Sequence, residues 1–312
     1  MNRWTCSLLL ITTILAAPAA AEEDWTSGKT LAVGGAGRAM PLDNSGIVLN
    51  PAAIVSPFAA YTTEAGYQRM DATRSDVFHA SAQDCKTSEL AMGISQTFEW
   101  ANPPFDPYTD LSWYSADTID ELDTKRRVDR FAWALAYGFA QRRFNIGAGL
   151  RVYHVQDPLR EEKTPVSLDV GATWWVSPNV AIGVVGGNLI PTKLEEEPTT
   201  LAAGFGVMSL GGILWFEADG VIDFDSGDKA QVDLRAGAQV TILTQFNIRA
   251  GYASDSAFGQ QYMSWGLGWT IPQFSVGYTM RVELGEMERR LNPDKGEVAN
   301  RMLHSWMMSV MF

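Results

Sequence analysis

Disulfide bridges and long apolar runs are both missing from this 312-residue sequence. Of its two cysteines, Cys6 lies in an N-terminal segment that we expect to be removed, so Cys85 is left alone and no intramolecular disulfide is possible. Although 46% of the residues are hydrophobic, no run after this segment approaches the ~18 apolar residues of a membrane-spanning helix. A helical membrane protein is therefore excluded.

Basic residues and histidine are also scarce. The chain has 24 Lys and Arg against 36 Asp and Glu, a net charge of −12, which argues against nucleic acid as a partner. His79, His154 and His304 have no cysteine or carboxylate at metal-ligand spacing. No GxSxG motif or other nucleophile and base arrangement occurs. We therefore expect no metal, no cofactor and no enzymatic activity.

The N-terminus has the features of a signal peptide. Arg3 precedes an apolar run from Leu8 to Ala17, and the small residues Ala19 to Ala21 fit signal peptidase. Cys6 lies before the apolar run, unlike the cysteine of a lipoprotein, which follows it. We expect residues 1–21 to be removed and the mature chain to be exported.

From Phe58 onward, the sequence alternates with a period of two residues. Phe144, Ile146 and Ala148, for example, alternate with Asn145 and Gly147. A soluble β-sandwich also alternates, but its outward positions should be polar, whereas here one parity carries large apolar residues and the other carries small and charged ones. This pattern favours a lipid-facing barrel wall around a polar interior.

The alternating segments predict about 14 antiparallel strands, an even number as in single-chain bacterial barrels. Their connections alternate between short and long, so we expect the short turns and both termini on the periplasmic side. The acid-rich loop Ala101–Arg127 lacks EF-hand spacing, so a solvated loop is favoured over a calcium site. The predicted strands are Phe58–Met70, Ser75–Cys85, Glu89–Trp100, Val128–Phe139, Arg143–Val155, Val166–Val176, Val180–Leu189, Thr199–Met208, Ile213–Asp223, Ala230–Ile242, Phe246–Ser254, Gln260–Ile271, Phe274–Leu284 and Leu303–Phe312.

Aromatic residues gather near the predicted strand ends, where interfacial girdles form in membrane barrels. The last strand ends on an aromatic carboxy-terminus, with alternate apolar residues at Trp306, Met308, Val310 and Phe312. This pattern looks like the signal read by the outer-membrane assembly machinery. The girdle candidates are Phe98, Trp100, Phe139, Phe144, Trp174, Trp175, Phe246, Trp269 and Phe274.

A segment rich in small residues precedes the first strand. Its glycines complete neither GxGxxG nor a Walker motif, so a nucleotide site is not expected. The segment instead resembles the start of the long-chain fatty-acid transporter (FadL-like) superfamily of 14-stranded outer-membrane barrels, which includes PorV-like barrels associated with secretion. The matching residues are Gly35, Gly37, Arg38, Ala39, Asp43, Asn50, Pro51 and Ala52.

The resemblance implies a hatch, a segment folded into the lumen, over residues 22–56, followed by a transmembrane barrel over residues 57–312. In that family, hydrophobic ligands enter from an outer groove and leave laterally through the wall. Small residues would let the backbone pack tightly in a lumen, and Asn50-Pro51 favours a turn into the wall. A flexible periplasmic leader is the alternative for this segment.

Eight charged residues in the interiors of the predicted strands lie on the polar parity, so they should face the lumen, because an arginine facing lipid at mid-membrane costs about 2–4 kcal/mol. Opposite charges are interleaved, which favours a salt-bridge lattice that holds the hatch over a conducting path. These residues are Arg151, Asp169, Glu217, Asp219, Asp233, Arg235, Arg249 and Arg281.

Loop centres give an expected register for two hairpins. A centre near Arg160 places Arg151 opposite Asp169. A centre near Ser226 places Glu217 opposite Arg235 and Asp219 opposite Asp233. Two facing acids need a nearby cation; Arg249 is the first candidate, and Arg38 of the hatch is the alternative.

The leading functional expectation is a FadL-like outer-membrane channel for small hydrophobic or amphipathic compounds. The alternative is a non-transporting PorV-like barrel that anchors or receives secreted or surface proteins. Outer-membrane lipid and the barrel assembly machinery are expected partners in both cases.

Overall fold

The computed structural model describes residues 26–55, 60–70, 75–101, 126–156, 162–194, 197–225, 230–255, 260–284, 290–292, 297–298 and 302–312. The expected signal peptide, residues 1–21, lies outside these ranges. So do residues 102–125, which form most of the acid-rich loop.

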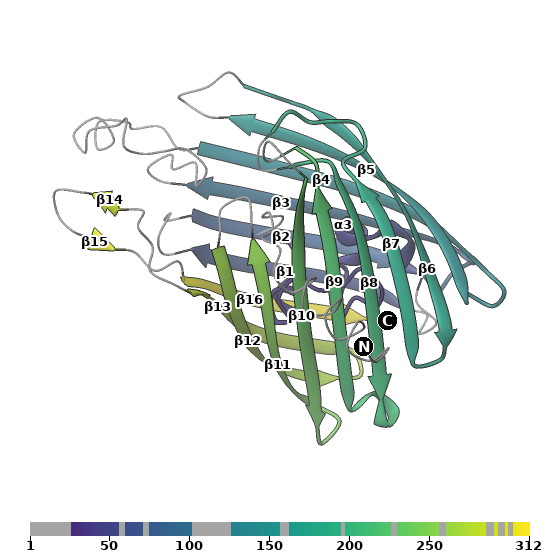
Figure 1. Cartoon of the computed structure of the whole chain (residues 1–312). Helices are drawn as coiled ribbons and strands as arrows, with labels where there is room; N and C mark the ends of the chain where they lie inside the picture. The colour runs from purple at the N-terminus through teal and green to yellow at the C-terminus, as the bar shows by residue number, and fades with distance from the viewer. Residues whose placement is uncertain are drawn as a thin grey trace, which may run out of the picture.

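Fourteen antiparallel strands close into a barrel, as predicted from the alternation, and the closure joins the first strand to the last. All the remaining pairs in the barrel sheet are formed by barrel strands that follow one another along the chain (Figure 1). The barrel strands are β1 (Tyr61–Met70), β2 (Ser75–Asp84), β3 (Leu90–Ala101), β4 (Arg126–Phe139), β5 (Phe144–Gln156), β6 (Val166–Ser177), β7 (Val180–Gly187), β8 (Thr200–Ser209), β9 (Leu214–Asp223), β10 (Gln231–Ile242), β11 (Phe246–Asp255), β12 (Gln260–Ile271), β13 (Phe274–Leu284) and β16 (Met302–Met311).

The predicted strand bounds agree with the observed ones to within a few residues; Phe58, the expected start of the first strand, lies outside the described residues. Strand β7 ends at Gly187 rather than Leu189, because Asn188 has a positive φ of 50° and turns the chain out of the sheet. A small hairpin of β14 (Arg290–Asn292) and β15 (Glu297–Val298) was not predicted and lies outside the barrel sheet.

The two faces of the wall differ as the alternation predicts. On β5, Phe144 and Ile146 are 44% and 45% exposed, whereas Asn145 and Arg151 are buried. Large apolar residues are exposed on the outer face of strands all round the barrel, from Met92 on β3 to Trp265 on β12 and Met308 on β16. An apolar outer wall around a polar lumen is the pattern of a transmembrane barrel.

One girdle prediction is wrong. Trp174 faces outward, but its neighbour Trp175 lies on the lumen parity, is 7% exposed and packs with Val33, Ala39 and Met40 of the N-terminal segment. Two adjacent residues of one strand point to opposite faces, so only one of them can belong to a girdle.

The register predictions for both hairpins are also wrong, by two residues. Asp169 lies opposite Gly149, and Arg151 lies opposite Ser167. On the second hairpin, Arg235 lies opposite Asp219 rather than Glu217, so no two acids face each other as Asp219 and Asp233 were expected to. Both hairpins are centred one residue away from the assumed position, a shift of two in the pairing that keeps every side chain on its predicted face.

The N-terminal segment lies inside the barrel, where Figure 1 shows it in purple. It contains three short elements, α2 (Gly28–Ala32), α3 (Gly46–Leu49) and the 3-10 helix η1 (Pro51–Ile54). Asn50 begins η1: its side chain accepts a hydrogen bond from the Ala52 backbone N–H, and Pro51 occupies the first helical position. We refer to residues 26–55 as the hatch.

None of the helices in the described ranges has the length and apolar character needed to span a membrane.

Candidate functional site

Strand β9 binds the hatch through two carboxylates, Glu217 and Asp219, which we call the clasp. Asp219 Oδ2 accepts hydrogen bonds from the backbone N–H groups of Gly37 at 2.9 Å and Arg38 at 3.2 Å. Glu217 accepts from Ala39 N at 2.6 Å and from Met40 N at 3.0 Å. Successive backbone N–H groups that converge on an anion form a strong binding concavity, so the clasp fixes this turn of the hatch to the wall.

The Arg38 side chain adds an ion pair to the clasp. Its Nη1 lies 3.3 Å from Asp219 Oδ2, with side-chain exposures of 2% and 0%. Arg38 thus occupies the role that we considered first for Arg249. Arg249 instead donates to Gln239 Oε1 at 2.7 Å, so its expected pairing with Asp219 was wrong.

Asn50 and Asp43 form hydrogen bonds within the hatch. Asn50 Nδ2 donates to the Arg38 carbonyl at 2.7 Å. Asp43 accepts from the Thr30 backbone N–H at 3.0 Å, from the Thr30 hydroxyl at 2.9 Å and from the Ser45 N–H at 2.9 Å, which joins α2 to the start of α3. Burial raises the pKa of the Asp43 carboxyl, but hydrogen bonds from Ser27 and Ser45 and the charge of Lys29 outweigh it and hold this pKa below its usual value.

Glycines of the barrel wall lie directly against the hatch, and we call them the glycine seat. A Cβ atom on Gly147 would lie 2.5 Å from Ala52 N, and Cβ atoms on Gly171 and Gly183 would overlap Asn50 and Arg38. On the opposite strands, Gly237 and Gly251 meet Val33 and Gly34 in the same way. These glycines pair across neighbouring strands, Gly147 with Gly171 and Gly237 with Gly251. The hatch therefore crosses the lumen and touches backbone on both sides.

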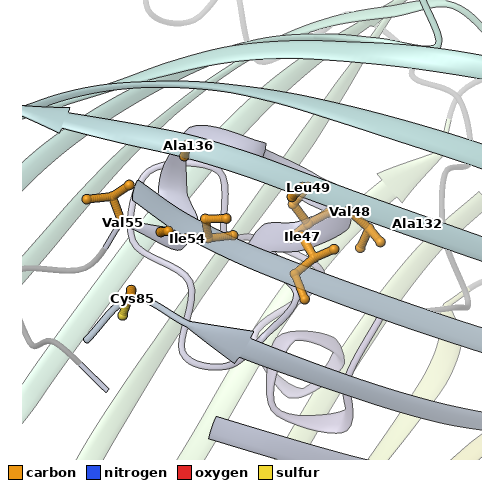
Figure 2. Close-up of a cluster of buried hydrophobic side chains, with 10 residues drawn as sticks. Ile47, Val48, Leu49, Ile54, Val55, Cys85, Ala132 and Ala136 are labelled. Carbon is orange, nitrogen blue, oxygen red and sulfur yellow. The ribbon is translucent and has the colours of Figure 1, made fainter. Parts of the chain in front are cut away.

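The hatch also makes an apolar contact with the wall, which we call the apolar cluster. Ile47, Val48, Leu49, Ile54 and Val55 pack against small side chains of β3 and β4 (Figure 2). The wall residues in this contact are Ala91, Ala132, Ala134 and Ala136, with Cys85 at the edge.

A hollow lies on the outer face of the same strands. Its volume is about 600 Å³, and it is lined by exposed apolar side chains such as Met92, Ile94 and Trp133. Gly93 and Ala134, which face inward, form part of its floor. The paired backbones of β3 and β4, with small residues at Gly93 and Ala134, therefore separate this outer hollow from the apolar cluster.

The remaining predicted lumen charges lie on the inner face of the barrel. Arg151 pairs with Asp169 at 2.5 Å, and Arg235 pairs with Asp233 at 3.3 Å. Arg281 lies 4.5 Å from the centre of the Tyr262 ring. Their functional role remains a prediction.

Functional residues that the sequence did not reveal lie in the connection between β7 and β8. Glu197, 3% exposed, contacts Arg130 Nε at 2.9 Å, and Arg130 also contacts Glu99 at 2.8 Å. Glu197 belongs to a run of glutamates in a polar loop, which is ordinarily a solvated surface. The sequence did offer one sign: β4 to β6 carry an aspartate and two arginines on the lumen parity. Such arginines can attract a loop carboxylate into the lumen.

The terminal strand closes the barrel between β1 and β13. Trp306 and Met308 are 47% and 52% exposed on the outer face, Val310 is half-buried and Phe312 is 65% exposed. The Phe312 N–H donates to the Tyr61 carbonyl at 2.9 Å. Its role as an assembly signal remains a prediction.

In the described part of the chain, no three His, Cys, Asp or Glu residues are grouped so as to hold a metal ion.

Comparison with known proteins relates the chain to others through its fold. No protein-family model matches it, and no curated protein matches it in sequence. Among solved structures it is similar to the CymD monoaromatic hydrocarbon channel, with a TM-score of 0.63 and 12% identity over 92% of this chain and 97% of that one.

Two further structures have the same architecture. A Pseudomonas aeruginosa FadL homologue gives a TM-score of 0.57 at 12% identity over 95% of this chain and 99% of its own. The P. putida toluene transporter TodX gives 0.57 at 10% identity, over 92% and 97%. At these identities the likeness shows the fold, and in fold the chain is a FadL-like β-barrel.

Proposed function

We propose that this barrel lies in the outer membrane and passes small hydrophobic compounds. The proposal draws support from an apolar outer wall and from a fold similar to that of channels named for monoaromatic hydrocarbons and toluene. Short turns such as residues 178–179 face the periplasm, so a cysteine label applied outside intact cells should reach the connection of residues 285–301 but not position 177.

The observation that carries the proposal is the pairing of the apolar cluster with the outer hollow. Val48 and Leu49 of the hatch lie against the inner side of β3 and β4, and Ile94 and Trp133 line the hollow on the outer side. A compound at the hatch would reach lipid through a local opening of the β3–β4 backbone ladder at its small residues, Gly93 and Ala134. Since burial of apolar surface is favourable by about 25 cal/mol per Å², such a route favours hydrophobic over polar solutes.

The route crosses the wall because the lumen is obstructed. The hatch contacts wall glycines on opposite sides of the barrel and is held there by the clasp. A path straight through the barrel would require these contacts to break. A lateral path at β3 to β5 would leave the clasp in place.

The test fills the outer hollow. Ala148 lines it on β5, and Ala148→Trp places a large side chain there on the lipid-facing parity, away from the hatch. The matched control is Ala218→Trp, which adds the same side chain on the outer parity of β9. We expect Ala148→Trp to reduce uptake of a radiolabelled monoaromatic hydrocarbon by cells that have no other such channel, and Ala218→Trp to leave it unchanged.

Equal uptake by the two variants would remove the lateral route. No hydrocarbon uptake by the unmodified protein would remove the transport proposal as a whole. A barrel that anchors partner proteins would then be the better explanation.

A further inference from the structure

A second barrier folds into the barrel from the end that carries the long connections. It is the inner part of the β7–β8 connection, residues 188–194 and 197–199, which we call the outer arm. Asn188 is fully buried; it accepts a hydrogen bond from the Tyr153 hydroxyl at 2.9 Å and donates to the Pro198 carbonyl at 3.1 Å. The Ser167 hydroxyl donates to the Ile190 carbonyl at 2.7 Å. The outer arm is therefore fixed to β5 and β6.

Glu197 anchors the other side of the outer arm. Its Oε1 lies 2.9 Å from Arg130 Nε on β4, and its Oε2 lies 4.0 Å from Arg151 Nη1 on β5. The Thr192 hydroxyl donates to the Glu197 carbonyl at 2.8 Å and closes the loop behind it. Arg130 thus holds the carboxylate by a hydrogen bond, whereas Arg151 faces it at a distance where only the attraction of charges acts, an attraction that is strong in a buried site.

Arg151 contacts the hatch as well as the outer arm. Its Nε donates to Asp169 Oδ2 and its Nη2 donates to the Val48 carbonyl of α3, both at 2.5 Å. Its Nη1 lies 3.5 Å from the Tyr153 hydroxyl and faces Glu197. One side chain, 2% exposed, thus joins the wall, the outer arm and the hatch.

The shape of the guanidinium makes these contacts interdependent. Arginine presents its N–H groups in a rigid planar fork, so Nη2 can point at Val48 only while Nε and Nη1 keep their present directions. Asp169 fixes one edge of the fork, and Glu197 with Tyr153 fixes the other. Loss of the Glu197 charge would let the fork turn about the Asp169 contact and move Nη2 away from the hatch.

We propose that Arg151 couples the outer arm to the hatch, so that withdrawal of Glu197 from the lumen loosens the α3 segment of the hatch. Arg151 acts as a positioning residue, and the coupling does not depend on which compound the barrel passes. A movement of the outer arm would in this way alter the hatch before any solute contacts it.

Hydrogen exchange on the full-length protein in detergent tests the coupling. In Glu197→Gln, amides of residues 46–50 should exchange about two- to tenfold faster, the range expected when one hydrogen bond that holds a segment is weakened. The matched control is Glu99→Gln, which removes the charge of the other carboxylate that contacts Arg130. It should leave residues 46–50 unchanged.

A second variant separates coupling from general loosening. Arg151→Lys keeps a positive charge beside Asp169 but has no fork to hold Val48 and Glu197 together. Exchange in residues 46–50 should already be fast in Arg151→Lys, and adding Glu197→Gln should not increase it further. Additive effects, or equal effects of Glu99→Gln and Glu197→Gln, would overturn the coupling. Because no hydrocarbon is used, either outcome leaves the transport proposal to its own test.

Discussion

Arg38 of the hatch and Asp219 of β9 form an ion pair across the inner surface of the barrel, with Nη1 and Oδ2 3.3 Å apart and both side chains almost completely buried. The same carboxylate accepts the backbone N–H groups of Gly37 and Arg38. The hatch is therefore attached by charge as well as by packing.

Replacement of Arg38 by alanine should loosen the hatch without preventing barrel formation. Removal of one partner from a buried pair costs about 3–5 kcal/mol because the other charge is left uncompensated, while the β9 ladder itself is untouched. We expect a higher permeability to small solutes in a liposome swelling assay and a near-normal yield of folded barrel.

Arg69→Ala is the control for this variant. Arg69 and Asp76 form an exposed pair at 2.9 Å on β1 and β2, and exposed pairs contribute little to stability. Permeability should stay at the wild-type level. A normal permeability in Arg38→Ala as well would show that the ion pair does not hold the hatch.

The glycine seat predicts a steric effect. Gly147→Ala places a Cβ atom 2.5 Å from the Ala52 backbone nitrogen, so hatch or wall must move, and overpacking of this kind costs about 1–3 kcal/mol. Gly220→Ala is the matched control, because the nearest atom to its Cβ is 3.9 Å away. Gly147→Ala should lower the thermal unfolding temperature or speed hydrogen exchange of the hatch amides. Equal behaviour of the two variants would argue against a close-fitting seat.

The terminal residue should matter for assembly. Phe312 exchanges backbone hydrogen bonds with Tyr61, and the two rings lie 5.9 Å apart at the closure of the barrel. Deletion of Phe312 removes these contacts and the aromatic end of the closing strand. We expect unfolded protein to accumulate in the periplasm and the heat-modifiable band on a gel to weaken. A normal band intensity would contradict the assembly role.

Much of the barrel could be predicted because the alternation of apolar and polar residues indicates directly which side chains face outward and which face the lumen. The outward Phe144 and inward Arg151 were assigned correctly from parity alone. Register could not be, because the centre assumed for each hairpin was one residue from the observed one, and a shift of two in the pairing leaves parity unchanged. Parity also shows that a glycine such as Gly147 faces inward, but not that another backbone lies against it.

The candidate site was predicted less completely. The hatch motif pointed to Arg38 and Asn50, and Arg38 was only the second choice as partner of Asp219. Glu197 was missed because a loop carboxylate gives no sign in the sequence of which strand it will meet. Its partners, Arg130 and Arg151, are brought together by the barrel only after the strands have paired.

Acid should weaken the hatch through Asp43. Because its pKa is lowered in the folded state, this carboxylate stabilises the hatch at pH values above about 4, the ordinary aspartate value, and the stabilisation is lost as the pH falls through the lower folded value. The difference in hydrogen exchange of the hatch amides between the wild type and Asp43→Asn should shrink as the pH falls below about 4. A difference that stays unchanged in this acid range would contradict the assignment.

Selectivity between solutes tests the central claim most directly. Purified protein in liposomes can be compared with protein-free liposomes for entry of a monoaromatic hydrocarbon, trapped inside by a hydrocarbon-binding carrier, and of a sugar of similar size. The account predicts that the protein accelerates entry of the hydrocarbon and leaves the sugar close to the protein-free rate, because the hatch obstructs the polar lumen while the outer hollow is apolar. Faster sugar entry with no effect on the hydrocarbon would contradict it.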